Sequence, residues 1–323
     1  MRPIIGLCIL GGLFLSGCEE DPEIQTRYFQ SLPVLFCMIN VNETEHVIRV
    51  ERMYSGNAAA DVSGKNADSL YFKNPDIKVH LAGFEQGRAI IPEPVWITDK
   101  EPGFFHSPDY LVYKFSLPLV SDKRVLYRSM NVSVEVPGLP AAAATTILQT
   151  PPVIWSPNIS QQTYYIVPDS PIRIQWSGSD WNEVDMYFEI IGQYPGGITT
   201  DTIHIQRVND NFINEKYYEV RFTFELLVEL IVKQFKPDKD LVRRYFGNVR
   251  TEVHTGNRDF SQYMHWYYGI NDFSDVSFSN VINGRGILAS RSTTIRDSMR
   301  LDYWSRQNLS LDPRMQALGF LER

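Results

Sequence analysis

The chain has 323 residues, in which 31 lysines and arginines stand against 38 aspartates and glutamates, so its formal net charge at pH 7 is -7. A surface of this sign repels nucleic acid and anionic lipid, which argues against nucleic-acid binding and against electrostatic attachment to a membrane. The 13% aromatic content, with 19 prolines and 20 glycines, favours a folded chain of many short strands and turns.

An apolar run over residues 4–15 is followed by Ser16, Gly17 and Cys18. The run has the length of a signal-peptide core and is too short to span a bilayer. Small residues before a cysteine resemble the lipobox of bacterial lipoproteins, which implies cleavage after residue 17 and a triacylated, palmitate-bearing Cys18. Since each buried methylene contributes about 0.8 kcal/mol, such an anchor is almost permanent. We therefore expect residues 1–17 to be a lipoprotein signal peptide; the alternative is an ordinary secretory signal with a chance cysteine.

Residues 18–31 form an expected tether that begins with the acids Glu19, Glu20 and Asp21. Acids directly behind a lipidated cysteine resemble the lipoprotein export signal of Bacteroidota. The resemblance implies an outer-membrane, lipid-anchored protein that faces the cell surface, whereas the alternative is a plain solvated tether.

The third cysteine, Cys37, would be the only thiol left in the mature chain. It lies in the apolar run 33–39, so a buried structural thiol is expected rather than a nucleophile.

The first part of the mature chain reads as short strands separated by turns. Residues 132–136 alternate apolar and polar side chains, as a half-buried strand requires. The predicted strands cover residues 34–41, 47–53, 77–81, 89–97, 110–117 and 131–136. Their spacing predicts an antiparallel β-sandwich over residues 32–140.

A composition break at 141–152, with four successive alanines and a proline pair, predicts a linker between two domains. Beyond it Ile172, Ile174 and Trp176 share one strand face, which resembles the early core strand of immunoglobulin-like and fibronectin-like sandwiches with Trp176 as the buried ring. The further expected strands cover residues 186–193, 200–207, 217–223, 247–255 and 277–289. We therefore expect a second sandwich over 153–323.

A small helical insertion is expected around residues 224–246. Apolar residues recur at helical spacing over 225–235, Pro237 interrupts them, and Asp238 can cap a second short helix that ends at Gly247. Two helices covering an open end of the sandwich is one interpretation, and a partner-binding helix is the other. The predicted fold class is thus mainly β: two antiparallel sandwiches, the second with an inserted helix pair.

The segment 279–291 contains the turn Asn283, Gly284, Arg285 and Gly286. The order of lipobox, acidic tether, sandwich, helix pair and this segment resembles a Bacteroidota outer-membrane lipoprotein family known as domain of unknown function 4249. That family has a similar Asn-Ile-Glu-Asn-Gly-x-Gly-Ile-Phe-x-Ser-Arg strand, from which this chain departs conservatively at residues 281 and 288 and by an isoleucine for an acid at 282. The resemblance implies genes beside TonB-dependent transporters and supplies no ligand or catalytic residue.

The turn itself has a structural explanation, because glycine and asparagine tolerate positive φ. The functional alternative is that Arg285 or Arg291 binds an acidic group of a ligand.

The sequence contains no nucleophile elbow, zinc-protease helix, phosphate loop or dinucleotide fingerprint. The six histidines never stand at metal-ligand spacing, although His254 and His265 can meet in space. Oxygen-rich stretches at 180–185 and 209–211 lack the spacing of a calcium loop, so ordinary turns are favoured. We therefore expect no catalytic residues, no metal and no cofactor.

Aromatic side chains give the strongest binding signal. The consecutive Trp266, Tyr267 and Tyr268 can stack on a sugar, and we take them with Arg285 as candidate ligand-binding residues. Three further tryptophans belong to the same signal: Trp155, Trp181 and Trp304. Burial in a core explains such rings equally well.

These expectations leave three classes of function. The leading one is a non-enzymatic accessory protein that binds a nutrient, such as a glycan, or the barrel of a TonB-dependent transporter. The second is a structural or adhesive envelope protein, and the third is a glycan-active hydrolase without a recognisable motif.

Overall fold

The computed structural model describes residues 31–53, 67–82, 88–98, 109–119, 128–208, 212–214, 217–268 and 278–321. Cys18, the signal segment before it and almost all of the tether lie outside these residues. The described chain is mainly β with few helices, as the sequence predicts. None of its helices has both the length and the apolar character needed to cross a membrane.

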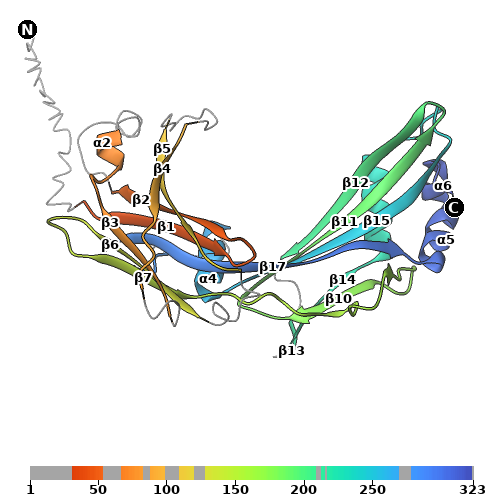
Figure 1. Ribbon diagram of the computed structural model, residues 1–323. Helices are drawn as coiled ribbons and strands as arrows, with labels where there is room; N and C mark the ends of the chain where they lie inside the picture. The colour runs from red at the N-terminus through yellow and green to blue at the C-terminus, as the bar shows by residue number, and fades with distance from the viewer. Residues whose placement is uncertain are drawn as a thin grey trace, which may run out of the picture.

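One long sheet runs through both lobes of the molecule (Figure 1). Its strands in spatial order are β12 (Gly197–Val208), β11 (Trp181–Tyr194), β15 (Arg243–Gly256), β17 (Arg285–Leu301), β1 (Pro33–Asn40), β2 (Glu45–Arg52), β5 (Tyr110–Ser116) and β4 (Glu93–Ile97). Neighbours along this path are antiparallel except β1 and β17, which are parallel, and the short β9 (Thr163–Tyr164) also pairs with β17 in parallel. The strand β17 passes from one lobe into the other.

A second sheet closes each lobe into a sandwich. In the N-terminal lobe its order is β16 (Val281–Ile282), β7 (Ala142–Ile147), β6 (Ser129–Glu135) and β3 (Asp76–Leu81). In the C-terminal lobe the order is β13 (Phe212–Asn214), β14 (Tyr217–Phe222), β10 (Ile172–Ser177) and β8 (Ile154–Ser156).

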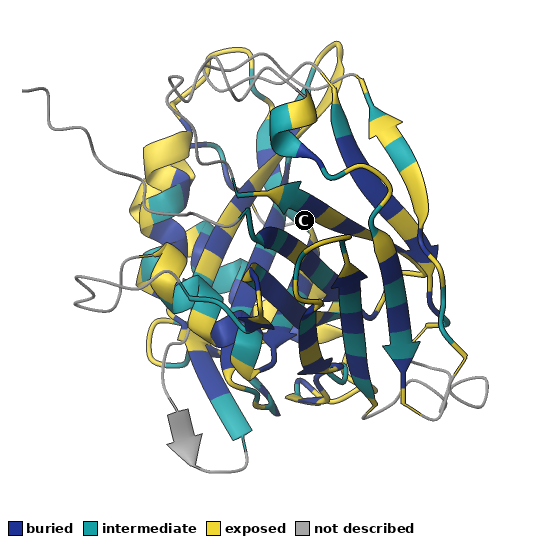
Figure 2. Ribbon diagram, turned by 90° about the vertical axis from the view of Figure 1, so that its left-hand side faces the viewer, coloured by how far each residue is buried: buried dark blue, intermediate teal, exposed yellow. Residues whose placement is uncertain are grey.

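Alternation along most strands builds the two cores, and Figure 2 shows it as bands of buried and exposed residues. In β10 the side chains of Ile172, Ile174 and Trp176 are buried, which confirms the predicted core face. Cys37 is fully buried in the other lobe, as expected of a structural thiol, and burial raises its pKa.

The described helices are α2 (Ala67–Leu70), α3 (Phe224–Gln234), α4 (Arg258–Tyr267), α5 (Tyr303–Leu311) and α6 (Pro313–Ala317). The predicted helix over 225–235 is α3. The hydroxyl of Thr223 caps it by accepting a hydrogen bond from the amide of Leu226, 3.3 Å away. Its apolar side, including Leu227 and Ile231, belongs to the core of the C-terminal lobe. Helix α3 therefore packs on its own lobe.

Three predicted segments differ in the structure. The second short helix expected up to Phe246 is wrong, because β15 begins at Arg243 and buries Val249, Thr251 and Val253, every second residue. The expected linker 141–152 contains β7, whose Ala142 and Ala144 are small enough to lie in the core between the two sheets. The strand expected over 277–289 is divided, since β16 ends at residue 282 and β17 begins at 285.

The N-terminal sandwich also extends beyond the predicted 32–140. It takes β7, β16 and the first half of β17 from later in the chain, because β1 pairs with residues 285–291 of β17. The two lobes therefore share a strand rather than a flexible connection.

Candidate functional site: an aromatic cavity at the edge of the N-terminal lobe

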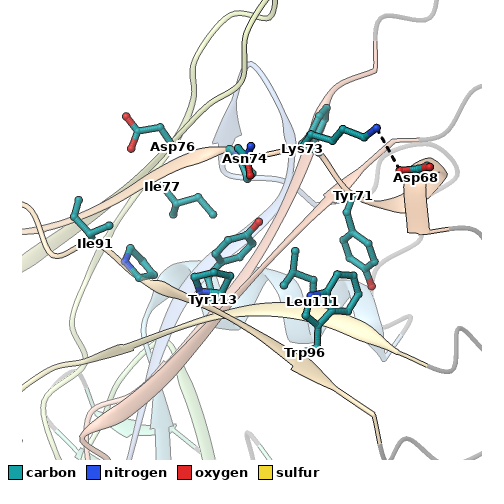
Figure 3. Close-up of a pocket in the computed structure, with 14 residues that line it drawn as sticks. Asp68, Tyr71, Lys73, Asn74, Asp76, Ile77, Ile91, Trp96, Leu111 and Tyr113 are labelled. Atoms are coloured by element: carbon teal, nitrogen blue, oxygen red, sulfur yellow. Dashed lines mark ion pairs between the residues drawn. The ribbon is translucent and has the colours of Figure 1, made fainter.

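A cavity of about 690 Å³ lies where the two sheets of the N-terminal lobe both end. Its walls come from α2 and the segment after it, from the edge strands β3 and β4, and from β5 beside β4 (Figure 3). The lining residues are Asp68, Tyr71, Phe72, Lys73, Asn74, Pro75, Asp76, Ile77, Ile91, Pro92, Pro94, Trp96, Leu111 and Tyr113. The volume falls within the range of about 300–1,000 Å³ that is typical of small-molecule pockets.

The pairing register of β4 and β5 determines which side chains form the floor of the cavity. On β4 and β5, Trp96 lies opposite Leu111 and Pro94 lies opposite Tyr113, so these side chains share one face. Proline is tolerated in β4 because this strand is the edge of the sheet. The floor residues Leu111 and Tyr113 are buried in the core of the lobe, which makes this side of the cavity rigid.

Two rings form the aromatic wall. Tyr71 packs edge-to-face against Trp96, with the ring centroids 5.6 Å apart and the planes at 85°. Tyr71 is buried, whereas Trp96 is half exposed and presents its indole to solvent. An exposed indole fixed by a buried neighbour is suited to stack on a flat apolar ligand face.

The rim of the cavity is polar. Lys73 pairs with Asp68 at 3.8 Å, and Lys78 pairs with Asp76 at 2.6 Å. Because these pairs are largely exposed, they contribute little to folding stability. Such exposed ion pairs cost little to rearrange when a polar ligand binds.

The electrostatics of the wall favour binding by neutral groups. Burial raises the pKa of both Tyr71 and Tyr113, so each phenol keeps its proton at physiological pH and can donate a hydrogen bond. The carboxylates in the lining are Asp68 and Asp76, and each faces a lysine at the rim. The cavity thus offers rings, hydroxyl groups and a charged rim.

The candidate residues Trp266, Tyr267 and Tyr268 lie at the end of α4 and are 44%, 65% and 52% exposed. They form an aromatic cluster in which Tyr263 contacts both Trp266 and Tyr267, and Tyr267 contacts Tyr268. Tyr268 stacks on the fully buried Trp181 at 6.0 Å and 7°. These rings are therefore surface groups on a buried base, and sugar stacking by them stays a prediction.

Arg285 is the first residue of β17 and is exposed, opposite Val34 of β1. In the described part of the chain it makes no ring contact with the α4 cluster, so the structure does not join the four candidate residues into one site.

The turn that contains Arg285 has a clear structural role. Asn283 and Gly286 both adopt positive φ, 52° and 109°. A Cβ atom at Gly286 would lie 1.9 Å from the carbonyl oxygen of Leu35, so the close pairing of β1 and β17 requires glycine there.

The other residues singled out in the sequence do not come together in one site within the described part of the chain. Trp155 and Trp304 are exposed outside the cavity. His254 contacts Asp185, whereas His265 contacts the carbonyl of Ser261. The ordinary turn expected over 180–185 is wrong, because β11 begins at Trp181. The side-chain oxygen of Asn182 accepts hydrogen bonds from the Trp176 indole and the Ser179 amide. The 209–211 stretch lies outside the described residues.

The sequence did not single out the cavity, because its residues come from three separate segments, within 68–77, 91–96 and 111–113. One local signal was present: residues 91–96 combine two prolines with an exposed tryptophan, a pattern that fits an edge strand beside a pocket.

Comparisons with known proteins add little. No protein-family model and no curated protein matches the chain. Among solved structures, a DUF4785 family protein from Legionella pneumophila is similar over 67% of this chain and 50% of that chain, with 10% sequence identity and a TM-score of 0.23. The chain thus spans about half the length of that protein. A TM-score this low does not establish a shared fold, and the resemblance to family 4249 stays a prediction.

Proposed function

We propose that this chain is a lipid-anchored outer-membrane protein that binds a glycan in the N-terminal cavity and assists a TonB-dependent transporter without catalysing a reaction. The observation that carries the proposal is the exposed indole of Trp96, fixed against the buried Tyr71 in a cavity of about 690 Å³.

A sugar ring matches the chemistry of this cavity. The apolar CH face of a pyranose can stack on Trp96, while its hydroxyl groups can hydrogen-bond to the neutral phenols of Tyr71 and Tyr113. The rim residues Asp68 and Lys73 offer a further acceptor and donor. A few polar groups around an apolar wall is the usual composition of a small-molecule site.

The anchor and the transporter partner rest on the sequence. The lipobox at Cys18 and the acids behind it support attachment to the outer membrane, and the resemblance to family 4249 supports a role beside a TonB-dependent barrel. Fourteen residues lie between Cys18 and Pro33, the first residue of β1, and a chain of that length spans at most about 50 Å. The N-terminal lobe, with its cavity, would therefore stay close to the membrane surface.

Binding can be tested with a panel of neutral oligosaccharides and calorimetry on the full-length protein in detergent. We expect Trp96→Ala to weaken the binding of the best oligosaccharide at least tenfold, since a lost stacking contact costs about 1.4 kcal/mol or more. Trp155→Ala is the matched control, because Trp155 is about as exposed but lies in the other lobe. The Trp155→Ala variant should bind the same oligosaccharide with the affinity of the unmodified protein.

Two results would contradict the proposed site. If no oligosaccharide in the panel binds, the proposed glycan ligand is rejected. If Trp266→Ala loses affinity and Trp96→Ala does not, the binding site lies at the end of α4 instead.

The location and the partner need a separate experiment. Replacing Cys18 with serine should release the protein from the sedimented envelope, because the acyl chains are the proposed anchor. Purification of the unmodified protein from solubilised outer membrane should recover a barrel transporter with it. A Cys18→Ser protein that sediments unchanged, or a purification without any barrel, would reject these parts of the proposal.

A further inference from the structure

The polar face of the C-terminal part of the long sheet carries a histidine–carboxylate cluster. The cluster lies on the neighbouring strands β11 and β15 (Figure 1). Glu183 and Asp185 are two residues apart on β11, and Glu183 lies opposite His254 of β15. Alternation therefore brings all three side chains to one face, opposite the core face of Val184 and Met186.

Three ligand atoms converge in this cluster. One nitrogen of His254, Nε2, is 3.1 Å from Oδ2 of Asp185, and one ligand atom from each of Glu183, Asp185 and His254 lies within 4.8 Å of the others. Asp185 is only 4% exposed, so its position is fixed, whereas Glu183 is partly exposed and can adjust. Ligand atoms around a tetrahedral zinc ion are separated by about 3.3 Å, given bonds of about 2.0–2.1 Å. The pair His254 and Asp185 already has this separation.

Each of the three side chains also contacts a further residue. Gln206 donates to Oε1 of Glu183 at 2.7 Å. His204 contacts Oδ1 of Asp185 at 2.5 Å, and its ring stacks on Tyr187. The hydroxyl of Thr293 is 2.9 Å from Nδ1 of His254. Metal ligands in proteins are typically oriented in this way by outer partners, which leave the inner atoms for the ion.

The charge of the cluster favours a cation. Glu183 and Asp185 each bring a carboxylate to it. Glu252 adds another carboxylate, with Oε2 at 3.4 Å from Nε2 of His254 and with Arg250 on its other side. Three carboxylates thus stand against one arginine.

The geometry points to a binding site for a first-row divalent transition metal ion, with Glu183, Asp185 and His254 as ligands and a fourth position open to solvent. An imidazole ligand selects zinc-like ions over calcium or magnesium, which take oxygen ligands. With the ion on Nε2, His254 carries its proton on Nδ1 and donates it to Thr293. The site is independent of the glycan cavity, which lies in the other lobe.

Zinc binding can be measured by calorimetry on the chelator-treated full-length protein in detergent, prepared without a polyhistidine tag. We expect one Zn²⁺ per chain. Asp185→Asn and His254→Gln should each weaken binding at least 100-fold, because each removes a ligand. Thr293→Val should weaken it about 10- to 100-fold, because it removes only the orienting partner.

The matched control is His80→Gln, which removes a partly buried histidine from β3 in the other lobe and should leave the zinc affinity unchanged. X-ray absorption at the zinc edge of the unmodified protein gives a second measurement that needs no variant. It should show nitrogen and oxygen ligands at about 2.0–2.1 Å with one imidazole. Absence of stoichiometric zinc, a spectrum without imidazole, or an equal loss in His254→Gln and His80→Gln would overturn the site.

Discussion

At the scale of single residues, Tyr164 shows how burial couples a side chain to pH. Its ring is 3% exposed in the core of the C-terminal lobe, and its hydroxyl forms a 2.7 Å hydrogen bond with the hydroxyl of Thr251. Burial raises the pKa of Tyr164 to about 12, and the hydrogen bond from Thr251 only partly offsets this. The folded protein therefore keeps this phenol neutral at pH values where an unfolded chain ionises it.

The sign of the pH dependence follows from this difference. Below a pH of about 10 both states hold the proton, and the stabilisation from Tyr164 is complete. As the pH rises from about 10 to about 12 only the unfolded state loses the proton, so the free energy of unfolding falls by about 1.4 kcal/mol for each pH unit. Above about 12 this contribution is lost.

The variant Tyr164→Phe should separate the contribution of the hydrogen bond to Thr251 from the contribution of the buried ionisable phenol. At pH 7 the variant should be about 1–3 kcal/mol less stable, because Thr251 loses its buried partner. Between pH 10 and pH 12 its stability should decline less steeply than that of the unmodified protein. Urea unfolding at a series of pH values measures both.

The neighbouring Tyr165 is half exposed and provides the control for that series. Tyr165→Phe should keep the alkaline slope of the unmodified protein, and a Tyr164→Phe slope that also stays unchanged would show that burial does not govern this titration.

At the scale of elements, the side chain of Asn257 joins three of them. Its oxygen caps α4 by accepting from the amide of Phe260 at 3.0 Å, and its nitrogen donates to the carbonyl of Ile147 at the end of β7. The same oxygen lies 3.3 Å from the amide of Ser290 in β17. This one amide therefore helps to fix the position of α4 against β7 and β17.

Asn257→Ala should cost more than an ordinary helix cap. Loss of a cap alone costs about 1 kcal/mol, and each further buried group left without a partner adds about 1–3 kcal/mol. We expect a total above about 2 kcal/mol, against about 1 kcal/mol for Thr223→Ala at the cap of α3. Equal losses in chemical denaturation would mean that Asn257 acts as a cap and nothing more.

Strands and helices whose apolar residues repeat at a clear interval could be predicted from the sequence. The other elements form because of contacts between distant segments. Alternation over 132–136 matches β6, and helical spacing over 225–235 matches α3. The start of β15 was mistaken for a helix, because Asp238 can cap a helix and Gly247 can end one. Strand β7 was missed since its alanines have low strand propensity and gain their stability from the space between two sheets.

The sites show the same limit. Strand alternation places Glu183 and Asp185 on one face, but only the register of β11 against β15 brings His254 beside them. The cavity likewise forms because β3 and β4 are both edge strands, and strand order between sheets is not visible in the sequence. Neither site was therefore predicted from the sequence, because each forms only when strands from separate segments pair.

At the scale of the whole molecule, β17 is part of both lobes. Its Leu288 belongs to the core of the N-terminal lobe, and its Met299 and Leu301 belong to the core of the C-terminal lobe. Between these residues the strand pairs with β1 in parallel and with β15 in antiparallel orientation. Unfolding of either lobe would therefore also disrupt β17, which contributes to the core of the other lobe.

We expect the two lobes to unfold in one transition. Leu288→Ala removes a fully buried side chain and should cost about 2–5 kcal/mol. Because β17 transmits this loss, hydrogen exchange should accelerate in the N-terminal β6 and also in the C-terminal β10 and β14, which are far from the substitution. Chemical denaturation followed by tryptophan fluorescence and by circular dichroism should show one transition with the same midpoint. If the strands of the C-terminal lobe instead keep their original protection in Leu288→Ala, the lobes are independent units, and the shared strand connects them without coupling their stability.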